Sequence, residues 1–186
     1  MKYMLHVITA LLLTFMVSGC AVDAELSPEQ DALIQNQAEV YTQVSMWMEK
    51  NHVYGTNYSR GFLIPINSKV RLLKADSKEI VFEYNGQEVT YLVYTKYTHA
   101  NTSQMLKRLF AKKPVDLSKY KHAKAIKHGN VLIGMTKDEV LLARGYPPFH
   151  ETPSLKANNW KYWHHRFSTA IVVFKNDKVL GVRGII

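Results

Sequence analysis

Cysteine is almost absent from this chain of 186 residues, because Cys20 is the only one. No disulfide can therefore form within one molecule. Acidic residues are also few, with 15 Asp and Glu against 24 Lys and Arg, so the formal net charge is +9. The sequence has no phosphate-binding glycine loop, dinucleotide fingerprint, His-Glu-x-x-His or Gly-x-Ser-x-Gly motif. These absences argue against disulfide-stapled domains and the common nucleotide-binding and hydrolase classes.

A hydrophobic run long enough to span a membrane is missing too. The apolar segment Val7 to Val17 is well short of the roughly 20 residues that a membrane-spanning helix needs. It follows Lys2 and precedes Val17-Ser18-Gly19-Cys20, an order typical of a secretion signal. Those four residues resemble the lipobox of bacterial prolipoproteins, which implies cleavage before Cys20 and acylation of its thiol. We expect a lipoprotein signal peptide at 1–19 and a lipidated tether at 20–26, the alternatives being cleavage near Ala21 or a signal anchor.

The same segment also predicts the cellular location of the mature chain. In Gram-negative lipoproteins Asp directly after the lipidated Cys favours the inner membrane, and Ala21 stands there instead. We therefore predict the periplasmic face of the outer membrane, with the lipid anchor as the membrane contact. Behind a secretion signal, the basic surplus indicates anionic lipid head groups or acidic envelope proteins as partners rather than nucleic acid. The most basic tract, 107–128, has a second interpretation as a solvated face.

The first folded segment is expected to be an amphipathic helix over 27–52. Ser27 can cap it, Pro28 suits its first position, and Gln30 completes a capping box. Apolar residues then recur at helical spacing, namely Leu33, Val40, Val44 and Trp47. Such a helix needs a partner, either its own domain or another protein.

Residues 53–113 are predicted to form a β-rich module. Alternating apolar residues on both sides of Asn85-Gly86 predict a hairpin, because both turn residues tolerate positive φ. Strands are also expected from Gly61 and at 70–73, followed by a helix over 103–111 capped by Asn101 or Thr102. Several short strands in this space resemble a bacterial SH3-like barrel or a curled sheet.

Residues 114–186 are predicted to form a second α+β module. Thr136 and Glu139 make a capping box, and Gly145 with the prolines beyond it ends a short helix. Three strands are expected after it, at 160–163, 169–174 and 178–182. The predicted class is therefore α+β: an N-terminal helix, a small barrel or curled sheet, and a helix with a three-stranded antiparallel sheet.

A family resemblance lies in this last module. Ile133-Gly134-Met135-Thr136, Gly145-Tyr146-Pro147 and Trp160-Lys161-Tyr162-Trp163 resemble the SmpA/OmlA family, which includes the BamE-type lipoproteins of the outer-membrane barrel assembly machine. The likeness covers about residues 120–186. It implies a noncatalytic envelope lipoprotein that contacts other proteins and sometimes anionic lipid. The chain departs from the family by its extra β-rich module.

The candidate binding residues are aromatic. Alternation along a strand separates Trp160 and Tyr162 from Trp163, so one set is expected in the core while the other can face a partner. We predict a partner-binding set of Tyr146, Phe149, Trp163 and Arg166, with core packing as the alternative. No catalytic residue, metal site or cofactor is predicted, because Ser118-x-x-Lys121 lacks its companion motifs and His164 and His165 would point to opposite strand faces.

The sequence thus predicts a protein-binding or scaffolding lipoprotein of the outer membrane, not an enzyme. The alternative is a periplasmic ligand-binding or hydrolase-inhibiting lipoprotein of the same fold.

Overall fold

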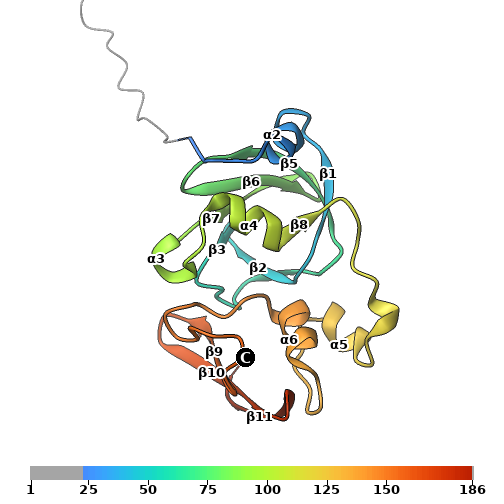
Figure 1. Cartoon of the computed structure of the whole chain (residues 1–186), viewed down its shortest axis with the longest axis vertical. Helices are drawn as coiled ribbons and strands as arrows, with labels where there is room; N and C mark the ends of the chain where they lie inside the picture. The colour runs from blue at the N-terminus through green and yellow to red at the C-terminus, as the bar shows by residue number, and fades with distance from the viewer. Residues whose placement is uncertain (1–22, 186) are drawn as a thin grey trace, which may run out of the picture.

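Two sheets, each with its own core, make up the protein (Figure 1). The computed structural model describes residues 23–185; the expected signal peptide, Cys20 and the first part of the tether lie outside that range. The protein is mixed α+β, with a curled eight-stranded sheet, a separate three-stranded antiparallel sheet and short helices. In the described range, no helix has both the length and the apolar character to cross a membrane.

The N-terminal part contains the larger sheet. Its elements are α2 (Pro28–Gln35), β1 (Glu39–Thr42), β2 (Met46–Glu49), β3 (His52–Tyr54), β4 (Phe62–Ile64), β5 (Lys69–Ala75), β6 (Glu79–Tyr84), β7 (Gln87–Leu92), α3 (Thr95–Thr98), α4 (Thr102–Leu109) and β8 (Phe110–Ala111). The strand order is β4-β2-β3-β7-β6-β5-β1-β8, antiparallel except for the β3–β7 pair. The helix α4 buries Met105, Leu106 and Leu109 in the core of this sheet.

The predicted helix over 27–52 is wrong beyond Gln35. Its start is confirmed, because Ser27 and Gln30 form the capping box. The chain then turns at Gln37, whose φ is +46°, and continues into β1, β2 and β3. Burial from Val40 to Met48 falls on every second residue, as in strands, with Ser45 between β1 and β2 buried in addition. The helical spacing of Val40 and Val44 is also compatible with that alternation. The strand-rich part therefore begins at Glu39, not at residue 53.

The other strand expectations hold more closely. The β6–β7 hairpin pairs Tyr84 with Gln87 across Asn85-Gly86, and both turn residues have positive φ. Ile80 and Phe82 face Tyr91 and Val89 in the core, as the alternation predicted. The expected helix after this sheet is α4, and Asn101 is its cap.

The C-terminal part is a helix pair beside the smaller sheet. Its elements are η1 (Leu117–Lys119), α5 (Ala123–Lys127), α6 (Lys137–Arg144), β9 (Asn159–His165), β10 (Ser168–Lys175) and β11 (Lys178–Gly184), with strand order β11-β10-β9. Thr136 and Glu139 form the predicted capping box of α6. Trp160, Tyr162 and Val172 are buried on the inner sheet face with Met135 and Val140, so this part has a core of its own.

Candidate functional site

The two sheets meet along a junction that backbone hydrogen bonds hold together. Tyr58 and Trp163 form a parallel bridge, and the amide of Ser59 donates to the carbonyl of Trp163 at 3.0 Å. The amide of Phe149 donates to the carbonyl of Tyr97 at 2.7 Å. The loop after β3 is thus fixed against β9, and the helix α3 is fixed against the loop after α6. Side chains from both sheets are brought onto one surface there.

Six aromatic side chains gather at this junction, and we term them the junction aromatics: Tyr54, Tyr58, Tyr94, Tyr97, His150 and Trp163. Consecutive ring centroids form a closed circuit: Tyr54–Tyr58 5.7 Å, Tyr58–Trp163 6.4 Å, Trp163–His150 6.5 Å, His150–Tyr97 4.9 Å, Tyr97–Tyr94 6.2 Å and Tyr94–Tyr54 6.5 Å. These separations are those of attractive aromatic pairs. The circuit links four segments of the chain into one partly exposed surface.

The polar edges of these rings give the surface a mixed character. Burial is the largest cause of a raised pKa at Tyr94. The neighbouring phenols of Tyr54, Tyr58 and Tyr97 raise this pKa further. The Tyr94 side chain is still 36% exposed. Aromatic residues that combine a rigid apolar body with a polar tip are enriched at protein interfaces.

Two lysines border the same surface. The ammonium of Lys96 lies 5.6 Å from the Tyr97 ring centroid, and that of Lys161 lies 5.3 Å from Trp163. Lys161 also pairs with Glu151 at 2.9 Å. The surface is therefore aromatic at its centre and charged at its edge, which is the usual anatomy of an interface.

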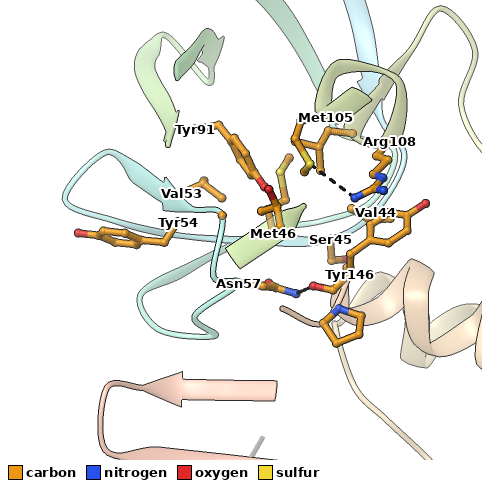
Figure 2. Close-up of a pocket in the computed structure, with 15 residues that line it drawn as sticks. Val44, Ser45, Met46, Val53, Tyr54, Asn57, Tyr91, Met105, Arg108 and Tyr146 are labelled. Atoms are coloured by element: carbon orange, nitrogen blue, oxygen red, sulfur yellow. Dashed lines mark hydrogen bonds between the residues drawn. The ribbon is translucent and has the colours of Figure 1, made fainter. Parts of the chain in front are cut away.

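A narrow cleft lies behind the junction aromatics (Figure 2). Tyr54 and Val53 are at one end, and Arg108 and Tyr146 at the other, where the guanidinium lies 5.1 Å from the Tyr146 ring centroid. Asn57 closes the base by donating to the carbonyls of Arg144 and Tyr146 at 2.7 and 2.8 Å. The cleft has about 30 Å³ of space for water-sized spheres, enough for about one water. It is therefore a packed seam and not a pocket for a small molecule.

Three of the four predicted binding residues lie at this junction. Trp163 is one of the junction aromatics, Phe149 stacks on His99 with ring centroids 4.0 Å apart, and Tyr146 lines the cleft. Arg166 does not join them: it is exposed in the turn between β9 and β10, with its guanidinium 5.3 Å from the Phe167 ring centroid. Trp160 and Tyr162 are buried, as the alternation of β9 predicted for one of its two sets.

The sequence interpretation missed Tyr54, Tyr58, Tyr94 and Tyr97. They lie at a strand end, in loops or, for Tyr97, in the short helix α3, at least 66 residues from Trp163 in the chain. Their one visible signal is composition, since four of the eleven tyrosines lie in two short segments around positions 56 and 95.

The residues weighed for chemistry have structural partners. The hydroxyl of Ser118 donates to Asp116 at 2.6 Å, which caps η1. His122, a further ionisable residue of the same segment, lies 3.1 Å from both carboxylate oxygens of Glu139. Among residues 23–185, no three His, Cys, Asp or Glu side chains gather as a metal site requires.

Comparison with protein-family models, with curated proteins and with solved structures found no match for this chain. The resemblance to the SmpA/OmlA family therefore depends on the quoted residues alone.

Proposed function

We propose that the protein is a noncatalytic bacterial envelope lipoprotein that binds other proteins, as an assembly or scaffolding module, at the periplasmic face of the outer membrane. The junction aromatics carry the proposal. Six rings from two sheets form one partly exposed surface, and Tyr and Trp are the residue types that dominate binding energy at interfaces. The narrow cleft beneath favours a protein over a small ligand at this place.

Two features support the proposed membrane location and the proposed class of protein. The lipobox-like segment ends at Cys20 and α2 begins at Pro28, so the tether before α2 is short. The SmpA/OmlA resemblance of the quoted residues supports the class, and those residues lie in and around α6 and β9. A tethered module gains effective concentration for partners at the same membrane.

Crosslinking in intact cells tests the binding surface. A photoreactive amino acid at position 94 should capture an envelope protein, which is then identified and purified for affinity measurements. Tyr94→Ala and Trp163→Ala should each weaken that complex by about tenfold or more, the range for a central aromatic. Phe62→Ala is the matched control, because Phe62 is 76% exposed but is not one of the junction aromatics.

The surface assignment is wrong if Tyr94→Ala and Trp163→Ala bind the partner as tightly as the Phe62→Ala control does, while all three variants remain folded by circular dichroism. The anchor is tested separately by mass spectrometry of the mature N-terminus. An unmodified Cys20 would contradict the proposed membrane location but would leave the measured affinity for the partner protein unaffected.

A further inference from the structure

A groove of about 430 Å³ lies between α2, α4 and the edge strand β8. Its floor is apolar and comes from Leu72, Leu106 and Phe110, and Leu33 of α2 lines it from the opposite side. It shares no lining residue with the junction cleft, because Met105, Arg108 and Leu109 on one face of α4 line the cleft while Leu106 and Lys107 on another line the groove. Its volume is within the roughly 300–1,000 Å³ typical of small-molecule sites.

The roof of this groove is held in place by α2. The Gln30 amide donates to the carbonyl of Ser103 at 2.8 Å and accepts from the Ser103 hydroxyl at 2.7 Å. Lys112, which directly follows β8, forms an ion pair of 2.8 Å with Glu29 of α2. These contacts fix α2 to α4 at one point and to the end of β8 at another. The groove is therefore preformed, which reduces the entropy lost on binding.

The rim of the groove is positively charged. Lys107, Lys112 and Lys113 line it with Glu29 as the one acid, so three positive charges against one negative leave a surplus of two. Within residues 23–185, no ion pair joins Lys107 or Lys113 to a carboxylate. An occupant that brings a negative charge to the rim would be attracted there.

We propose that this groove binds a single-chain anionic amphiphile, with the acyl chain on the leucine-rich floor and the carboxylate or phosphate head at the lysines of the rim. This site is separate from the protein-binding surface proposed above and does not depend on it. A cavity of roughly 150 Å³ holds benzene, so 430 Å³ has room for about 17 heavy atoms, the size of one long acyl chain.

A peptide fits the groove less well than an acyl chain. The neighbouring edge, β8, is only two residues long and runs directly into Lys112 and Lys113. Short edges and edge lysines disfavour the addition of a strand. The floor consists of aliphatic side chains and Phe110, which form no hydrogen bonds. It therefore suits an acyl chain, which also has no hydrogen-bonding groups.

The test is photolabelling of the full chain, as isolated from cells, with palmitate that carries a diazirine on its chain. Label should concentrate in peptides covering α2 and residues 103–113. Lys107→Glu combined with Lys113→Glu should raise the half-saturating palmitate concentration by about tenfold or more. Lys124→Glu with Lys127→Glu is the matched control, because these exposed lysines belong to the same basic tract but lie outside the groove.

Leu33→Trp provides a second variant, since it fills the groove from its roof without changing charge. It should reduce labelling of residues 103–113, while a retained melting curve shows that the protein is folded. Label spread evenly over the chain, or labelling that survives the charge reversal, would overturn the proposal. Equal labelling by an uncharged monoacylglycerol probe would also overturn it, because the rim would then play no part.

Discussion

Glu139 shows how one side chain can serve two elements. Its carboxylate accepts from the amide of Thr136 at 2.8 Å in the capping box of α6 and from the amide of His122 at 3.0 Å. The residue is 3% exposed, and burial by itself would keep the carboxyl neutral. The donated hydrogen bonds outweigh burial, so the pKa of Glu139 lies below its usual value. Glu139 thereby connects α6 to the segment that begins α5.

We predict that Glu139→Gln lowers the free energy of unfolding by about 1–3 kcal/mol, because the amide offers one acceptor oxygen where the carboxylate offers two. Urea denaturation at pH 7 measures this. Asp138→Asn is the control: Asp138 also lies in the first turn of α6 but is exposed, so its loss should cost under about 0.5 kcal/mol. Equal effects of the two substitutions would contradict the role given to Glu139.

The same residue predicts a dependence on pH. The folded state binds a proton at Glu139 less readily than the unfolded state, so acid favours unfolding. Its contribution should be present above the ordinary pKa of 4.5 and disappear as the pH falls through the lower pKa of the folded protein. The stability gap between the unaltered protein and Glu139→Gln should therefore narrow from pH 7 to pH 3. A gap that stays constant over this range would count against the assignment.

Arg144 is a buried cation that pairs with no carboxylate among residues 23–185. Its guanidinium lies 4.0 Å from the Trp47 ring centroid, and Nη1 donates to the carbonyl of Gly129 at 3.1 Å. Nε and Nη2 have no partner among the described residues, and burial lowers the pKa of Arg144 to about 10. We predict that Arg144→Met is neutral or stabilising, whereas Arg144→Ala costs about 2–4 kcal/mol through lost packing on Trp47. Paired chemical denaturation curves decide this, and a methionine variant as unstable as the alanine one would show that the charge itself is needed.

At the scale of elements, the sequence correctly predicted the helix starts and turns that depend on neighbouring residues. The capping boxes at Ser27 and Thr136 and the Asn85-Gly86 turn involve residues within three positions of each other, so the sequence shows them directly. The β9–β11 meander also followed from alternation and short turns.

Contacts between residues far apart in the chain determine the parts of the fold and of the candidate site that the sequence did not predict. Within residues 39–54, β1 pairs with β5 and β3 pairs in parallel with β7, contacts that no local pattern contains. Only the β2–β3 pair is local, across the turn at Lys50-Asn51. The junction aromatics depend on the same long-range placement, since Tyr94 and Trp163 are neighbours only once both sheets are folded. Trp163 could be nominated from alternation along its strand, but its partners could not.

The edge strand β4 gives a prediction about an element. Gly61 precedes it with φ +90°, and a Cβ there would overlap the carbonyl oxygen of Met48 in β2. Gly61→Ala should therefore separate β4 from β2 and lower the free energy of unfolding by about 2 kcal/mol or more. Gly86→Ala is the matched control, because φ is +77° but nothing lies within 4 Å, which leaves a backbone cost of about 1 kcal/mol. Thermal melts should show a clearly lower melting temperature for Gly61→Ala than for Gly86→Ala. Equal losses of stability would show that β4 can move away from β2 without a free-energy cost.

At the scale of the whole molecule, the protein consists of two cores that share one junction. The first core is formed within the larger sheet and α4, and the second within α5, α6 and the smaller sheet. Asn57 is the most specific link between them, since its side chain donates to the carbonyl of Arg144, the last residue of α6, and to that of Tyr146 in the loop beyond it. The junction aromatics form a continuous surface only while the two cores stay in register.

We predict that Asn57→Ala loosens the junction without unfolding either core. The substitution removes two hydrogen bonds and places alanine at φ +55°, at a cost of about 2–4 kcal/mol. Hydrogen exchange should accelerate at the amides of Ser59 and Phe149, which bond across the junction, while amides of β6 and β10 stay protected. Asn85→Ala has the same backbone strain in an exposed hairpin turn, so it should leave the junction amides unchanged. If Ser59 and Phe149 remain protected in Asn57→Ala, stacking of the junction aromatics alone suffices to hold the two sheets together.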